Sequence, residues 1–327
     1  MTGIDLVTGA FGYSGTYLRR ALHDRGRQVR TLTNHPPAVG GKLSDGSAIE
    51  IFPYTFDDPQ ALRRAFEGVE TFYNTYWVRY APGGTSYAQA VANTKVLFEA
   101  AREAGVRRIV HVSITNPDPD SFYEYYRGKA ALERHLVGLG VPYAIVRPSV
   151  IFGGEDIFIN NIAWLVRRFH VFAIPGDGRY RLRPVYVADL AALCVELGSR
   201  PDGDPDVTID AVGPQDFTFE DLVGTVAEAV GTHWWPVHLP PAVVAVILRG
   251  LSVLTRDVVL TRDEIDGLMA SLVTTDGEAT CPTRLTDYLR EHAAQVGASY
   301  HSELDRRRPA QVPPAVSGTF PGRSALR

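Results

Sequence analysis

The first 150 residues alternate between short apolar runs and longer stretches in which apolar residues recur at helical spacing. Short runs that predict buried strands occur at 4–7, 29–33, 49–51, 69–74, 107–113 and 141–149. Helical spacing predicts helices that start near Gly12, near 59, near Tyr87 and near Tyr125. This alternation predicts an α/β fold in which a doubly wound parallel sheet is covered by helices on both faces.

Three glycines stand at the first predicted junction between strand and helix, in the run 8–15, which reads TGAFGYSG. Gly9 would permit a tight turn, Gly12 would let the backbone approach a pyrophosphate, and Gly15 would let the helix lie close to the strand. The N-terminus of the helix offers N–H groups and a partial positive charge to phosphates. We therefore expect a dinucleotide site of the Rossmann type here, rather than an ordinary turn with small residues.

The chain after residue 150 leaves the sheet and returns to it once. Helices are predicted over 160–168, 219–230, 239–254 and 262–272 and from Val187, with strands over 171–174 and 207–212 and a bulky loop at 233–235. We expect an NAD(P)-binding domain at 1–150, joined by 184–212, and a smaller substrate-side region at 151–183 and 213–305. The tail at 306–327 is rich in Arg, Pro, Ser and Gly and is expected to be mobile.

Composition and charge narrow the class of protein. The 327 residues are 45% hydrophobic and 21% charged with a net charge of −4, which fits a globular protein and argues against a nucleic-acid surface. Two cysteines form no disulfide framework, and His233 and His238 lack partners at metal spacing, so no metal is expected. The glycine turn begins almost at Met1, and the apolar run 240–248 is too short to span a bilayer. We expect a cytoplasmic protein without a membrane or nucleic-acid partner.

The end of the second predicted strand normally determines which dinucleotide is bound. An acidic residue there binds the adenosine ribose of NAD, whereas basic residues accept the extra phosphate of NADP. Asn34 and His35 occupy this place, with Arg30 and Lys42 nearby and no carboxylate to repel a phosphate. The sequence therefore favours NADP over NAD, although the same residues also suit a simple polar turn.

A tyrosine and a lysine are spaced four residues apart after the fifth predicted strand. Tyr125 and Lys129 project from one face of a helix, and Ser113 ends the preceding strand. With the glycine run 8–15, this set resembles the short-chain dehydrogenase/reductase superfamily, whose signatures are Thr-Gly-x-x-Gly-x-x-Gly and Tyr-x-x-x-Lys. The segment 181–190 resembles the extended and atypical branches, which include NAD-dependent epimerases and dehydratases, NmrA-like proteins and relatives of a complex I accessory subunit.

The resemblance implies catalytic roles for these three residues. Tyr125 would be the acid/base, Lys129 would lower its pKa and hold the nicotinamide ribose, and Ser113 would orient the substrate carbonyl. A carbonyl oxygen that gains negative charge as hydride arrives needs a proton, and a neighbouring ammonium lowers the ordinary tyrosine pKa of about 10. The alternatives are a tyrosine that merely packs in a tyrosine-rich helix start and a serine bonded to the backbone.

Further cofactor contacts follow from the same resemblance. The strand 141–149 ends where the family places the nicotinamide, whereas Thr55 and Phe56 depart from the Asp and apolar pair usual at the adenine. The expected cofactor-binding residues are Thr8, Gly9, Phe11, Gly12, Tyr13, Ser14, Gly15, Thr33, Asn34, His35, Thr55, Phe56, Asn74, Lys129, Pro148, Ser149 and Val150.

Substrate contacts are expected beyond the carboxyl ends of the strands, where ligands bind in open α/β sheets. The candidates are Tyr76, Trp77 and Arg79 after the fourth strand, and Phe152, Arg181 and Arg183 on the C-terminal side. The aromatic group equally suits a packed corner. The arginines at 181 and 183 suit an anionic or carbonyl substrate, and equally a solvated strand face.

The function expected from these features is an NAD(P)-dependent oxidoreductase that transfers hydride to or from a small carbonyl or alcohol. Two alternatives stay open. One is an NAD-dependent epimerase or dehydratase on a sugar-like substrate, and the other is a non-catalytic NADP-binding sensor or assembly protein. Retention of Ser113, Tyr125 and Lys129 together argues against the sensor, since a sensor needs no acid. The resemblance also allows a homodimer.

Overall fold

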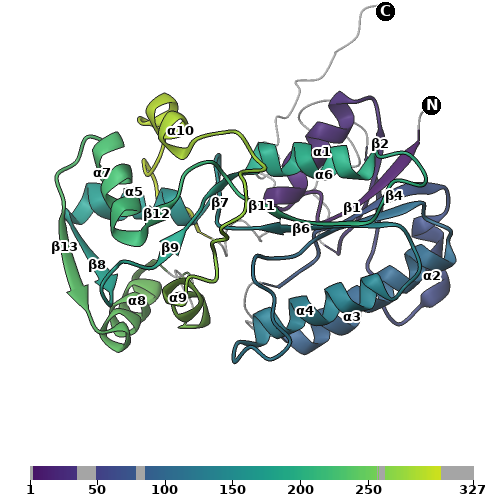
Figure 1. Cartoon of the computed structure of the whole chain (residues 1–327), viewed down its shortest axis with the longest axis horizontal. Coiled ribbons are helices and arrows are strands. Elements are labelled where there is room, and N and C mark those ends of the chain that lie inside the picture. The colour runs from purple at the N-terminus through teal and green to yellow at the C-terminus, as the bar shows by residue number, and fades with distance from the viewer. Residues whose placement is uncertain (1–2, 35–48, 79–84, 256, 258–261, 303–327) are drawn as a thin grey trace, which may run out of the picture.

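A seven-stranded parallel sheet forms the centre of the larger lobe (Figure 1). The computed structural model describes residues 3–34, 49–78, 85–255, 257 and 262–302. The strands are β1 (Ile4–Thr8), β2 (Gln28–Leu32), β3 (Ile49–Phe52), β4 (Val69–Asn74), β5 (Arg108–Val112), β6 (Tyr143–Pro148) and β11 (Val207–Ala211). Their order is β11-β6-β5-β4-β1-β2-β3, and every pairing is parallel. The order reverses between β1 and β4, which is the switch point where such sheets bind ligands.

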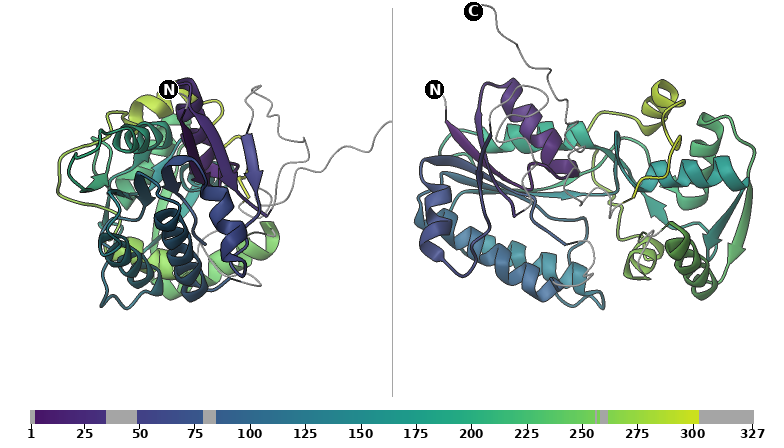
Figure 2. Two further views of the ribbon diagram at one scale, coloured as in Figure 1. Left: turned by 90° about the vertical axis from the view of Figure 1, so that its right-hand side faces the viewer. Right: turned by 180° about the vertical axis from the view of Figure 1, so that it is seen from behind.

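Helices cover both faces of this sheet, which confirms the predicted fold class. One face carries α1 (Tyr13–Asp24) and α6 (Val187–Gly198), and the other carries α2 (Pro59–Phe66), α3 (Tyr87–Glu103) and α4 (Glu124–Val137) (Figures 1 and 2). Successive strand residues enter opposite cores: Leu6 packs with α2–α4, and Val7 with α1 and α6. The strands are apolar in consecutive positions because both of their faces are buried.

Two helices of the sheet lobe, α2 and α3, begin at capping residues that the sequence supplies. Asp58 accepts a hydrogen bond from the Ala61 N–H at 2.9 Å and is followed by a proline at the first helical position of α2. Ser86 caps α3 in the same way through the Gln89 N–H. In contrast, α1 begins after Gly12 with no side-chain cap among the described residues.

The smaller C-terminal lobe has a core of its own, built mainly by helices. These are α5 (Phe158–Phe169), α7 (Phe219–Ala229), α8 (Pro241–Thr255), α9 (Arg262–Met269) and α10 (Leu285–His292). Short strand pairs connect them: β7 (Ile151–Phe152) with β10 (Val185–Tyr186), β9 (Arg181–Leu182) with β12 (Phe217–Thr218), and β8 (Val171–Pro175) with β13 (Trp235–Leu239). The two lobes lie end to end (Figure 2).

Two elements of the C-terminal lobe differ from the sequence predictions. The loop expected at 233–235 passes directly into β13, because Trp235 pairs with Val171 across the ribbon. The following helix begins at Pro241 rather than near 239. No helix in the described part of the chain combines the length and the apolar character that crossing a bilayer requires.

Candidate active site

The glycine turn has the geometry that the sequence predicts. Gly9 has a φ of +67°, which disfavours residues with a side chain. A Cβ on Gly15 would lie 2.0 Å from the carbonyl oxygen of Gly9, so helix α1 can approach the turn this closely only with glycine there. Because no side chain caps α1 among the described residues, the N-terminus of this helix could bind an anionic group at the end of β1. This cradle fits a dinucleotide pyrophosphate.

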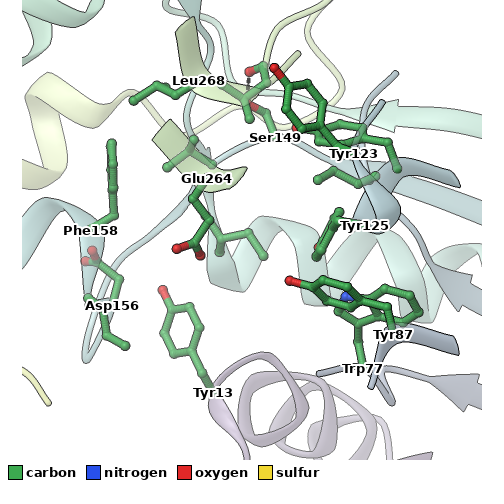
Figure 3. Close-up of a pocket in the computed structure, with 16 residues that line it drawn as sticks. Tyr13, Trp77, Tyr87, Tyr123, Tyr125, Ser149, Asp156, Phe158, Glu264 and Leu268 are labelled. Atoms are coloured by element: carbon green, nitrogen blue, oxygen red, sulfur yellow. Dashed lines mark hydrogen bonds between the residues drawn. The ribbon is translucent and has the colours of Figure 1, made fainter. Parts of the chain in front are cut away.

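A cavity of about 340 Å³ lies beyond the carboxyl ends of the strands, between the two lobes (Figure 3). Its wall is mostly aromatic and aliphatic. It is lined by Tyr13, Trp77, Tyr87, Ile114, Tyr123, Tyr125, Tyr126, Ser149, Val150, Ile151, Asp156, Ile157, Phe158, Glu264, Leu268 and Val273. The aromatic residues of the sheet lobe stand on one side, and α5 and α9 supply the other.

Tyr125 stands on the cavity wall, in the first turn of α4. Its ring makes edge contacts with Trp77 and Tyr87, with centroid separations of 5.4 Å and 5.9 Å. The three rings lie together in Figure 3. The tyrosine predicted to be the acid/base therefore lines the cavity, and two aromatic neighbours restrict its orientation.

Lys129 lies one helical turn after Tyr125 and is buried. Its Nζ donates to the carbonyl oxygen of Val112 at 3.0 Å and lies 4.4 Å from the ring centroid of Trp77. Burial lowers the pKa of Lys129 to about 7, because a dry environment disfavours the ammonium. The lysine is thus behind the indole of Trp77, which separates it from the cavity.

Ser113 follows β5 but is buried, and its Oγ has no hydrogen-bond partner among the described residues. Its neighbour Ile114 lines the cavity instead. A buried hydroxyl without a partner is rare in folded proteins. Its position beside the cavity wall suits a group that acquires a partner when ligand is present.

Several predicted cofactor residues are held by hydrogen bonds to neighbouring strands. The hydroxyl of Thr8 accepts from the Thr75 and Tyr76 N–H groups at 2.8 Å and 3.0 Å. The side-chain amide of Asn74 is paired with His111 Nδ1 at 2.9 Å, and its oxygen accepts from Thr8. These hydrogen bonds connect the ends of β1, β4 and β5 and so fix the position of the glycine turn that follows β1.

The part of the site where the sequence predicts adenine is aromatic. Asn34 Oδ1 accepts from the Tyr54 N–H at 2.7 Å, which ties the end of β2 to the segment after β3. The Thr33 N–H bonds to the carbonyl of Phe52 at 2.9 Å. Phe56 stacks on Tyr54 with a centroid separation of 5.3 Å, and the Thr55 Oγ1 is buried without a partner among the described residues.

The remaining cofactor candidates lie around the turn and at the end of β6. Phe11 is half-buried and packs against the core under α1 and α6, and Ser14 stands in the first turn of α1. Pro148 is the last residue of β6, Ser149 donates its hydroxyl to the carbonyl of Val273, and Val150 lines the cavity. His35, expected at the ribose, lies outside the described residues.

Three of the expected substrate contacts do not line this cavity. Phe152 is fully buried in the C-terminal core, where it packs against Tyr186 and Tyr288. The exposed Arg181 forms ion pairs with Asp216 and Asp276 instead of facing the cavity. Arg183 donates to backbone carbonyl oxygens at 213, 275 and 277.

The other substrate candidates follow β4. Trp77 lines the cavity, whereas Tyr76 stands behind it in the aromatic cluster with Tyr54 and Phe56, where its hydroxyl accepts from Asn93. Arg79 lies outside the described residues.

Two acidic residues of the cavity escaped the sequence analysis. Glu264 of α9 directs its carboxylate into the cavity (Figure 3). Asp156 precedes α5 and accepts from the N–H groups of Gly153 and Ile159 and from the side-chain amide of Asn160. Burial raises the pKa of Asp156 to about 6. Neither residue belongs to a recognisable motif. Their place at the cavity becomes visible only in the folded structure, where the C-terminal lobe packs against the sheet lobe.

A hydrogen bond joins the glycine turn to the C-terminal lobe. The Tyr13 hydroxyl donates to the carbonyl oxygen of Gly153 at 2.7 Å, across the edge of the cavity. Tyr13 was predicted from the turn alone as a cofactor contact. In this structure it also closes one side of the cavity (Figure 3).

Comparisons with known proteins identify a matching family model and several related proteins. Residues 9–158 match a family model described as NAD(P)H-binding. The chain is 27% identical over 244 residues to NADH dehydrogenase (ubiquinone) 1 alpha subcomplex subunit 9, mitochondrial, of Arabidopsis thaliana, covering 72% of this chain and only 60% of that protein. It is 27% identical to the 3 beta-hydroxysteroid dehydrogenase/Delta 5-->4-isomerase of Mycobacterium tuberculosis, over 75% of this chain and 74% of that one.

Solved structures share the fold. The triphenylmethane reductase of Citrobacter sp., crystallised with NADP(H), superposes with a TM-score of 0.73 over 88% of this chain and 99% of that one, at 18% identity. Other structures of similar fold include a protein bound to NAD and a nucleoside-diphosphate-sugar epimerase.

Proposed function

Because this chain is an NAD(P)H-binding homologue of the extended branch of short-chain dehydrogenases/reductases, we propose that it is an NAD(P)-dependent oxidoreductase that uses Tyr125 as its acid/base. The family and the NAD(P) cofactor are as the sequence predicted. The observation that carries the proposal is the place of Tyr125, on the wall of a mostly apolar cavity beside the glycine turn, with Lys129 one helical turn away.

The proposed chemistry needs a proton at the substrate oxygen. A bound nicotinamide supplies or accepts the hydride. The Tyr125 hydroxyl donates its proton to the carbonyl oxygen as negative charge develops there, or takes it back in the reverse direction. Lys129, when protonated, favours the phenolate that remains. The buried hydroxyl of Ser113 and the Trp77 indole N–H, both without a partner among the described residues, are the donors available to orient ligand groups.

The substrate that suits this cavity is apolar. Aromatic and aliphatic side chains dominate the wall, and Asp156 and Glu264 are the acidic residues among those that line it. An apolar lining favours a hydrophobic ketone or secondary alcohol, because transfer of its surface from water to this cavity is favourable. The M. tuberculosis relative is named for a hydroxysteroid, an alcohol of this kind. A nucleotide-sugar, the substrate class of an epimerase, would find few polar partners here.

The choice of NADP over NAD is part of the proposal. It rests on Asn34, an uncharged residue just after β2, at the place where NAD-binding proteins of this fold carry a carboxylate. Titration of NADPH and NADH by fluorescence measures the two affinities directly, and equal affinities would contradict the preference.

The oxidoreductase proposal is tested by following NADPH absorbance with hydrophobic ketones, and NADP⁺ reduction with the matching alcohols. Turnover that depends on the ketone supports the proposal. If NADPH binds and no ketone or alcohol of the panel is turned over, the non-catalytic cofactor-binding role gains support.

A further inference from the structure

Helix α8 exposes a face of large apolar side chains to solvent. Val243, Val246 and Ile247 are 44%, 70% and 46% exposed. They are spaced three and four residues apart, so they form one outward stripe. Val244, on the opposite side, is buried and anchors the helix to the lobe. We call Val243, Val246 and Ile247 the α8 face.

The ribbon of β8 and β13 lies at the same end of the C-terminal lobe as α8 (Figure 1). It exposes further apolar side chains. Trp235 pairs with Val171 across the ribbon, and Val237 stands two residues further on the same side. Their side chains are 73%, 45% and 39% exposed. A monomeric protein in water rarely exposes so many large apolar residues in one region, and such regions mark interaction sites.

The chain segment that contains α8 is one-sided in charge, although Glu220 of α7 pairs with His238 of the neighbouring β13 at 3.0 Å. From residue 229 to residue 255 the sequence contains no Asp or Glu, whereas Arg249 is cationic. Arg249 is exposed on α8. An apolar helical face with arginine at its border and tryptophan nearby is the composition of segments that lie in the interface of anionic bilayers.

We propose that the α8 face docks onto the surface of an anionic lipid bilayer, with the helix lying in the interface. This differs from spanning the membrane, for which α8 is too short, and it changes the expectation of no membrane partner drawn from the sequence. The proposal does not depend on the oxidoreductase activity. It has a consequence for that activity, because α9, the next helix, lines the cavity through Glu264 and Leu268. Docking would bring the cavity wall near the lipid phase, from which an apolar substrate partitions.

The direct test is flotation of the full chain with lipid vesicles. Vesicles of phosphatidylcholine with about 30% phosphatidylglycerol supply the anionic surface, and pure phosphatidylcholine vesicles test the role of charge. We expect binding to the anionic vesicles that weakens at high salt, because exposed charges are screened. The double variant Val246→Glu/Ile247→Glu should bind at least about ten-fold more weakly, since it removes the apolar area that enters the interface.

Val137→Glu is the matched control, because Val137 is 53% exposed at the end of α4 in the other lobe. It should bind vesicles as the parent does. Circular dichroism and thermal unfolding establish that the variants are folded. The proposal is overturned if the parent does not bind anionic vesicles, or if the double variant binds equally well. It is also overturned if the parent is a dimer that the double variant splits, since the α8 face would then contact a second copy of the chain.

Discussion

Trp77 places its indole ring over the ammonium group of Lys129, with the nitrogen 4.4 Å from the ring centroid. The same ring makes an edge contact with Tyr125. The two residues of the Tyr-x-x-x-Lys signature therefore both contact a third residue, Trp77, which follows β4. If Lys129 holds a nicotinamide ribose, as the sequence predicts, that ribose would also lie near Trp77.

The position of Trp77 predicts a fluorescence signal. We expect NADP⁺ to quench the intrinsic fluorescence, because Trp77 lines the cavity in which the proposed nicotinamide would lie. Trp77→Phe should abolish most of this quenching while retaining a ring beside Tyr125. Trp235→Phe is the control, because Trp235 is 73% exposed at the far end of the C-terminal lobe. Quenching that survives in Trp77→Phe and disappears in Trp235→Phe would contradict this placement.

Burial of Lys129 predicts a dependence of stability on pH. The lysine has a pKa of about 7 in the folded chain and an ordinary value of 10.5 when unfolded. Between these values the unfolded chain holds a proton that the folded chain lacks, so the free energy of unfolding rises with pH. The slope is at most about 1.4 kcal/mol per pH unit for one group. Denaturant unfolding of the parent and Lys129→Met between about pH 7 and 8.5 isolates this contribution. Parallel pH profiles would show that burial does not depress this pKa.

Gly15 is expected to tolerate no side chain. A Cβ there would lie 2.0 Å from the Gly9 carbonyl oxygen and 2.7 Å from its carbon, so backbone must move. Gly15→Ala should lower the free energy of unfolding by about 2–4 kcal/mol and weaken dinucleotide binding, because the turn that holds the pyrophosphate shifts. Gly250→Ala on α8, where a Cβ meets open space, should instead stabilise by about 0.5–1 kcal/mol. Comparable effects of both changes on NADPH affinity would contradict the close packing at Gly15.

Asp156 should not tolerate an amide. Hydrogen-bond donors from Gly153, Ile159 and Asn160 converge on both of its carboxylate oxygens. In Asp156→Asn one oxygen becomes an NH₂ group that faces a donor, and we expect a loss of about 1–3 kcal/mol in the free energy of unfolding. Asp58→Asn is the control, since Asp58 receives the Ala61 N–H on one oxygen and asparagine caps helices equally well. A stability loss in the control alone would refute the assignment.

The sheet and the glycine turn could be predicted because their signals are local. The adjacent apolar residues Leu6 and Val7 predict a strand that is buried on both faces. Gly9 and Gly15 have the spacing that a dinucleotide-binding glycine turn requires. Tyr125 and Lys129 are four residues apart on one helix, so they lie on the same helical face wherever that helix packs. These features depend on neighbours within a few residues.

The rest of the cavity depends on which distant segments meet. Phe152 was expected to contact the substrate because it follows β6. Its ring instead packs against Tyr186 and Tyr288 in the C-terminal core. Arg183 is held by carbonyl groups whose residues lie about thirty to ninety positions away. Glu264 belongs to no recognisable sequence motif. It lines the cavity only because α9 packs beside it. The hydrophobic periodicity of the sequence does not predict these contacts between distant segments.

The most direct test of the account compares Tyr125→Phe with Tyr126→Phe, because adjacent tyrosines of α4 both line the cavity but only Tyr125 has lysine four residues later. With a ketone that the parent reduces, Tyr125→Phe should lower kcat by about 10²–10⁴-fold. Its NADPH affinity should stay within about three-fold of the parent, because a phenylalanine ring preserves the contacts with Trp77 and Tyr87. Loss of turnover in Tyr126→Phe with full activity in Tyr125→Phe would contradict the central claim that Tyr125 transfers the proton.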